Sequence, residues 1–161
     1  MAEAGHNTVN YMEQGGASWV VNGTLNVGSE ATLNGIVHTV VATFDTAITA
    51  NKAIGAHGLG VYIPAKAVIL DGFIDALTTA TSATDAATIA VKVEGTADTV
   101  AAIAISDATN PWDAGIHAVK ELNTAATMVK TTARREITVT TAVEALTAGK
   151  FNVVLRYVVS A

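Results

Sequence analysis

The sequence predicts an all-β protein, an antiparallel β-sandwich or jelly-roll-like domain with an extended N-terminal arm. Three observations lead to this fold class. The 161 residues include 31 Ala, 23 Thr and 20 Val, and Thr and Val favour strands. Short apolar runs alternate with turn residues, and no run carries a helical apolar stripe longer than two turns. Charged residues make up only 14% of the chain, the opposite of the composition of disordered proteins.

The chain divides into three parts by its local composition. Residues 1–16 are polar, contain Gly and lack periodicity, which predicts a flexible arm. Residues 17–35 contain Asn22-Gly23 and Asn34-Gly35, and Asn-Gly favours type I′ hairpin turns. A β-ribbon or turn-rich linker is therefore expected there, with turns of a solenoid as the alternative. Residues 36–161 are expected to form the β-sandwich domain.

Eight strands are expected within this domain, because eight apolar runs are separated by turn chemistry. The last is the clearest, since every odd-numbered position from Phe151 to Val159 is apolar. Ala148-Gly149 is expected to turn the chain into this strand. Residues 78–88 are expected to form a long exposed loop, and residues 116–122 one helical turn. The expected strands are 36–44, 57–63, 67–77, 87–94, 99–106, 127–130, 135–143 and 150–159.

The overall balance of charge and hydropathy excludes several partners. A net charge of −5 gives no electrostatic reason to bind nucleic acid. Apolar runs are broken by charges long before the roughly 20 residues that span a bilayer, so no membrane contact is expected. The N-terminus lacks a signal-peptide pattern, which favours synthesis in a cytoplasm. Because the apolar side chains are mostly small and Cys is lacking, we expect a thin core that gains stability from neighbouring copies.

The sequence offers little that predicts chemistry, and we expect no enzyme, catalytic residue, metal, cofactor or pocket. The four histidines do not have metal-ligand spacings, and the Gly-rich residues 55–60 lack the Lys-Ser/Thr of a phosphate-binding loop. Asp71 and Asp75 would lie about 13 Å apart on one strand face. That separation exceeds the roughly 5–9.5 Å of glycosidase carboxylate pairs, and a solvated face or a subunit contact is expected instead.

Five residues are candidates for an interaction with a partner: Trp19, Tyr11, Trp112, Arg134 and Arg135. The two Trp residues lie among turn residues, and Trp is frequent at interaction anchors. Trp19, next to the arm, is expected to contact a partner or a neighbouring copy, or alternatively to cap the open end of the sandwich. The two Arg residues precede Glu136, and an interfacial salt bridge is expected of them.

The sequence also resembles the small decoration, or cement, proteins of tailed-bacteriophage capsids. The resemblance depends on the polar residues 1–16, the Trp19-Val20-Val21-Asn22-Gly23 opening, Ile63-Pro64-Ala65-Lys66-Ala67 before a strand, and Leu146-Thr147-Ala148-Gly149 before the last strand. It implies a homotrimer in the virion, on the outer capsid surface, assembled in the host cytoplasm. This trimer would bind the major capsid protein and stabilise its lattice. The alternative is a head fibre, an appendage or a glycan-binding β module that uses Trp112 and Tyr62 as exposed aromatics.

Overall fold

A computed structural model describes residues 10–12, 19–21, 36–95, 99–118 and 128–160. The chain forms two units, Met1–Thr32 and Leu33–Ala161. In the smaller unit, β1 (Asn10–Met12) pairs antiparallel with β2 (Trp19–Val21). A strand at residues 10–12 was not predicted, since that range was assigned to the arm. Both Asn-Gly pairs lie outside the described residues.

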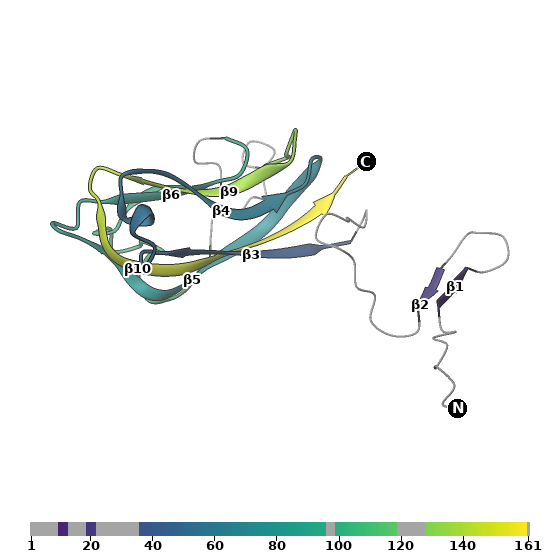
Figure 1. The fold of residues 1–161 in the computed structure, drawn as a ribbon, viewed down its shortest axis with the longest axis horizontal. Helices are drawn as coiled ribbons and strands as arrows, with labels where there is room; N and C mark the ends of the chain where they lie inside the picture. The colour runs from purple at the N-terminus through teal and green to yellow at the C-terminus, as the bar shows by residue number, and fades with distance from the viewer. Residues whose placement is uncertain (1–9, 13–18, 22–35, 96–98, 119–127, 161) are drawn as a thin grey trace, which may run out of the picture. The chain divides into compact units, whose positions relative to one another are not determined.

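The larger unit is a sandwich of two four-stranded antiparallel sheets, which confirms the predicted fold class (Figure 1). We call the sheet with the order β3-β10-β5-β8 sheet I and the sheet with the order β4-β9-β6-β7 sheet II. A short 3-10 helix, Thr49–Lys52, follows β3. The strands are β3 (His38–Asp45), β4 (Gly55–Ile63), β5 (Ala67–Ser82), β6 (Thr88–Lys92), β7 (Val100–Ala104), β8 (Gly115–Ala118), β9 (Arg135–Ala142) and β10 (Leu146–Val159).

The eight strands have the connectivity of a jelly roll. Pairing is nested from the outside inwards, β3 with β10, β4 with β9, β5 with β8 and β6 with β7, as in one long hairpin. Rolling this hairpin adds the pairs β10–β5 and β9–β6, which close the two sheets. The first and last strands of the domain are therefore neighbours, and β10 lies between β3 and β5 (Figure 1). Eight-stranded jelly rolls occur in viral capsid proteins, lectins and cupins.

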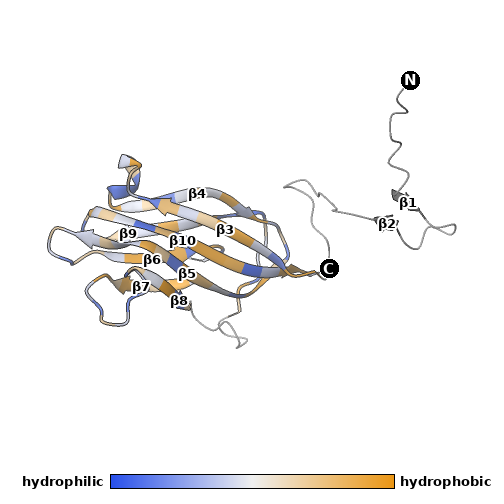
Figure 2. Cartoon of the chain, turned by 90° about the horizontal axis from the view of Figure 1, so that it is seen from below, coloured by the Kyte–Doolittle hydropathy of each residue, from blue (hydrophilic) through white to orange (hydrophobic). Residues whose placement is uncertain are grey.

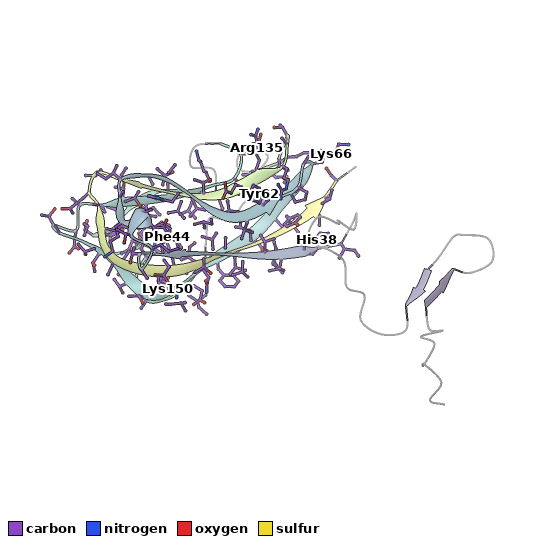
Figure 3. All side chains as sticks on the ribbon, in the orientation of Figure 1. His38, Phe44, Tyr62, Lys66, Arg135 and Lys150 are labelled. Carbon is purple, nitrogen blue, oxygen red and sulfur yellow. The ribbon has the colours of Figure 1, made fainter. Side chains whose placement is uncertain are left out.

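Alternating small apolar side chains fill the space between the sheets, and three aromatic rings supply most of the remaining bulk. Phe151 on β10 stacks on Phe44 of β3, with ring centroids 4.9 Å apart, and contacts Trp112 at 5.2 Å. All three side chains are fully buried, and Phe44 lies between the two layers in Figure 3. Phe151 therefore joins the rings of Phe44 and Trp112 in a core otherwise built from Ala, Val, Ile, Leu and Tyr157.

Several expectations about individual elements are wrong. Strand β5 continues to Ser82, so the expected loop at 78–88 is shorter, because Thr78–Ser82 pair with the start of β10. Gly149 lies inside β10, at a register shift with a φ of +146°, rather than in a turn. The first residues of the expected helical turn belong to β8. Of the expected strand at 127–130, the described residues form a single bridge, Lys130 to Val68.

The aromatic cluster generates the first prediction. The substitution Phe151→Ala is expected to lower the free energy of unfolding by about 3–5 kcal/mol, because it leaves a cavity beneath Phe44 and Trp112. Urea unfolding followed by circular dichroism measures this change, with the exposed Lys52→Ala as control. A loss below about 1 kcal/mol would show that the cluster does not organise the core.

A second prediction concerns Thr141 on β9. Its side chain is fully buried, and its hydroxyl has no hydrogen-bond partner among the described residues. An unpaired buried hydroxyl costs about 1–3 kcal/mol, and Val has nearly the same shape without it. We expect Thr141→Val to raise the midpoint of thermal unfolding, and Thr138→Val, at a partly exposed position of the same strand, to change it much less.

Candidate protein-binding surface

The outer face of sheet I carries an apolar row that crosses all four strands. Val41, Val154, Phe73 and Ala118 are paired in register from β3 through β10 and β5 to β8. Val41 is 52% exposed and Phe73 37% exposed, whereas Val154 between them is 8% exposed. Orange stretches on these strands in Figure 2 show the same apolar character. We call these four residues the apolar row.

Polar rows flank the apolar row, and their members are paired with one another. On one side Arg156 of β10 forms an ion pair with Asp71 of β5. On the other side Asn152 accepts a hydrogen bond from Thr43 at 2.8 Å and donates one to Asp75 at 3.3 Å. Because these groups satisfy each other across the strands, a partner that covers the face does not have to supply opposite charges to Arg156 and Asp71.

Asp71 and Asp75 are therefore placed on one solvent-facing strand surface, as their spacing predicts. The pKa of the Asp71 carboxyl is lowered, chiefly by the hydrogen bond from Arg156. A third pair on the same sheet joins Lys150 and Asp45 at 2.9 Å. Phe73 lies between the two carboxylates with the same parity and projects from the same face, but it is not among the five interaction residues predicted from the sequence.

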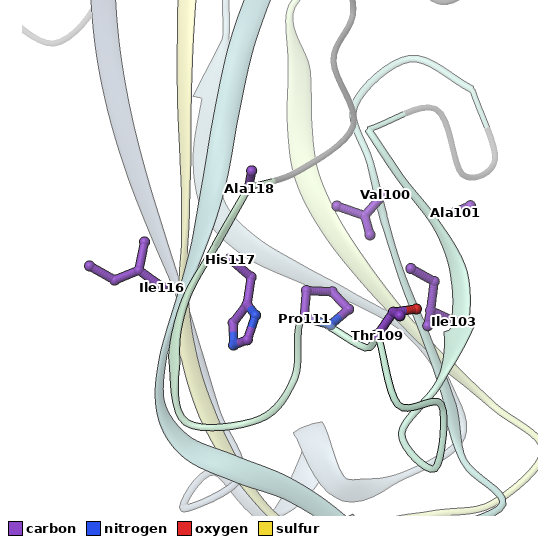
Figure 4. Close-up of a pocket in the computed structure, with 8 residues that line it drawn as sticks. All are labelled: Val100, Ala101, Ile103, Thr109, Pro111, Ile116, His117 and Ala118. Carbon is purple, nitrogen blue, oxygen red and sulfur yellow. The ribbon is translucent and has the colours of Figure 1, made fainter.

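A cleft of about 530 Å³ lies between β7 and β8, at the edges of the two sheets (Figure 4). Its walls are mainly apolar, and Thr109 and His117 are the polar side chains among the lining residues. His117 Nε2 lies 2.8 Å from the carbonyl oxygen of Asp113. The expectation of a domain without a pocket is thus wrong. The lining residues are Val100, Ala101, Ile103, Thr109, Pro111, Ile116, His117 and Ala118.

Trp112 does not provide the exposed aromatic platform that its loop suggested. Its side chain is fully buried against Phe151, and its indole Nε1 donates to the carbonyl oxygen of Ile103 at 3.3 Å. Asn110 Oδ1 accepts from the Trp112 backbone N–H at 2.8 Å and so fixes the turn. The turn residues around Trp112 therefore orient the ring inwards, and the expectation of an exposed ring is wrong.

Arg134 and Arg135 bind separate partners within the chain. The Arg134 guanidinium lies 3.9 Å above the ring centroid of Tyr62, so one face of this partly exposed ring is covered. Arg135 donates to both carboxylate oxygens of Glu94, at 2.8 and 2.9 Å. Arg135 thus forms a salt bridge within the chain, and its acid is Glu94. Tyr62 and Arg135 both lie on the layer formed by sheet II (Figure 3).

Tyr11 and Trp19 lie in β1 and β2, whose side chains are outside the described part of the structure. His38 stacks on Tyr157 with ring centroids 5.2 Å apart, and His57 Nε2 lies 2.8 Å from the carbonyl oxygen of Ala53. Within the described ranges, no three His, Cys, Asp or Glu residues are arranged to hold a metal ion. None of the helices described there has the length and apolarity to cross a membrane.

Comparison with known proteins identifies a shared fold. No family model and no curated protein matches the sequence. Three solved structures are similar, all containing phage capsids. The chain aligns with one from the cyanophage Pam1 capsid at a TM-score of 0.57 and 16% identity, covering 84% of this chain and 98% of that one. A chain from the capsid of Ralstonia phage GP4 aligns at a TM-score of 0.55 and 18% identity, covering 83% of this chain and 94% of that one. A chain from the capsid of Helicobacter pylori bacteriophage KHP30 aligns at a TM-score of 0.55 and 12% identity, covering 80% of this chain and 92% of that one.

The Glu94–Arg135 pair generates a prediction about pH. Hydrogen bonds from Arg135 and then Thr132 lower the pKa of Glu94 from 4.5 to about 2. The stability that the charged carboxylate provides is therefore present above pH 4.5 and is lost as the pH falls towards 2. We expect Glu94→Gln to lower the melting temperature at pH 7, and the difference from the unmodified protein to shrink towards pH 2.

Thermal melts followed by circular dichroism at pH 7, 4 and 2 measure this effect. Asp85→Asn, at an exposed carboxylate in a loop, is the control and should melt like the unmodified protein. An equal difference at pH 7 and pH 2 would contradict an electrostatic role for Glu94.

Proposed function

We propose that the protein is a non-enzymatic structural component of a phage virion, which binds the outer surface of the capsid as a homotrimer and stabilises the lattice of the major capsid protein. The observation that carries this proposal is the correspondence of fold with three chains from phage capsid structures over 92–98% of their lengths. The resemblance of the sequence to decoration proteins agrees with it and supplies the finer role.

The outer face of sheet I is the surface proposed to contact the capsid. It combines exposed apolar side chains at Val41 and Phe73 with a flanking ion pair, Arg156 with Asp71. Burying such a face removes apolar area from water while Arg156 and Asp71 stay paired with each other. Three such faces in one trimer would act together, so that each contact can be weak while the whole trimer binds firmly.

A glycan-binding role has less support. Trp112 is buried, and the Tyr62 ring carries Arg134 on one face. A sugar that stacks on an aromatic ring needs an open ring face, which Trp112 does not offer.

We expect Phe73→Asp to weaken binding to capsids prepared without the protein. A carboxylate at the centre of the apolar row would have to lose its hydration on binding, and we expect the affinity to fall at least tenfold. Cosedimentation with the capsids measures it, and the melting temperature shows whether the variant folds. Val41→Asp is a second variant. Val41 is more exposed than Phe73 and lies on β3, so this substitution leaves the contact between Val154 and Phe73 of β5 unchanged.

The matched control is Thr140→Asp, on the outer face of sheet II, which should bind normally. Sedimentation equilibrium of the free protein should give three times the 16.4 kDa mass of the chain. A monomer that never cosediments with capsids would contradict the proposal. Binding that survives both substitutions in the apolar row would place the contact elsewhere.

A further inference from the structure

The strands β7 and β8 end their sheets on the same side of the sandwich, where the cleft separates them. Each pairs with a described strand on one side only, β7 with β6 and β8 with β5. The outer edge of such a strand presents backbone N–H and C=O groups that its own sheet does not pair. This side of the sandwich can therefore accept another strand.

The opposite side of the sandwich is blunted in ways that β8 is not, whereas β7 has a register shift of its own against β6, between Ile89 and Val91. At the β3/β4 side, β4 is interrupted by a register shift between Gly58 and Tyr62, with Gly60 at a φ of +71°. Asp45 ends β3 in an ion pair with Lys150. Natural proteins use bulges, charges and prolines to protect free edges from pairing. The sequences of β7 (VAAIA) and β8 (GIHA) contain no Asp, Glu, Lys, Arg or Pro.

The cleft is continuous with the apolar row on the outer face of sheet I. Ala118 is paired with Phe73 as the last member of that row and also lines the cleft. Ile116 lines the cleft too, and it is 75% exposed. An apolar surface therefore runs from the middle of sheet I around the edge of β8 and into the cleft, and one partner can cover all of it.

The cleft favours an uncharged occupant. The polar side chains of its lining are Thr109 and His117, and the imidazole Nε2 is held at the Asp113 carbonyl oxygen. An ionised side chain buried there would lose its hydration without gaining an opposite charge. A branched aliphatic side chain would instead exchange water for contacts with Val100, Ile103 and Pro111.

We propose that the major capsid protein supplies an extended, uncharged segment that pairs with β8 as a fifth strand of sheet I and inserts an aliphatic side chain into the cleft. This is β-strand addition, in which main-chain hydrogen bonds provide affinity and a pocket for a side chain provides specificity. The inference rests on the proposed function, since it specifies what the capsid contributes to the same interface.

Amide hydrogen exchange of the full chain, free and bound to capsids prepared without it, tests the pairing. Exchange is expected to slow in residues 115–118 on binding, because a new strand would protect the outward amides of β8. Residues 55–58 of β4, on the opposite side, should exchange as in the free protein. Unchanged exchange in 115–118 while the protein is bound would overturn the proposal.

A matched pair of substitutions tests the cleft. Ala101→Trp, on β7, fills the cleft from its wall and should weaken capsid binding at least tenfold. Ala56→Trp adds the same ring at an exposed position of β4 and should bind normally. Melting temperatures show that both variants fold, and sedimentation equilibrium shows whether they keep the oligomeric state.

The outcomes separate this inference from the proposed function. If the unmodified protein binds capsids but Ala101→Trp binds equally well, the strand addition is wrong and the capsid role stands. If Ala101→Trp dissociates the oligomer instead, the occupant of the cleft is a second copy, and the proposal is also wrong. If the unmodified protein does not bind capsids at all, the proposed function itself fails.

Discussion

The pairing of β10 with both β3 and β5 is the constraint on which the rest of the structure depends. One side of β10 carries Phe151, which joins the aromatic rings of the core. The other side carries Val154, the buried centre of the apolar row, between Val41 and Phe73. Because β10 is the last strand of the domain and pairs with its first strand, both the core and the outer face of sheet I depend on a pairing between residues distant in sequence.

The thin core expected from the composition is only partly what the structure shows. Most buried side chains are small or branched, but Phe44, Phe151 and Trp112 meet at one point and supply volume that Ala and Val cannot. Some of the large exposed side chains, Val41, Phe73 and Ile116, belong to the apolar row or the cleft. Phe73 and Ile116 leave apolar area in water that the isolated chain does not bury. The buried rings on β3, on β10 and in the loop before β8 are thus a different set from the exposed apolar side chains on β5 and β8.

The alternation of apolar residues was enough to predict the fold class and most of the long strands. Successive side chains of any β-strand point to opposite faces, so a strand with one buried face shows this alternation in its sequence. It failed where long-range pairing overrides local preference. Thr78–Ser82 look like a loop by composition, yet they continue β5 because the start of β10 lies beside them. The inward orientation of Trp112 depends on Asn110 and on Phe151, which is distant in sequence. The cleft was equally invisible, because it is formed by two strands that belong to different sheets.

In the proposed role, sheet I faces the capsid shell and sheet II faces outwards. A cryo-electron-microscopy reconstruction of capsids carrying the protein tests it most directly. The account predicts groups of three sandwiches on the outer surface, with Val41 and Phe73 against the shell and Tyr62 towards solvent. Sandwiches attached through sheet II, with Phe73 exposed to solvent, would contradict it.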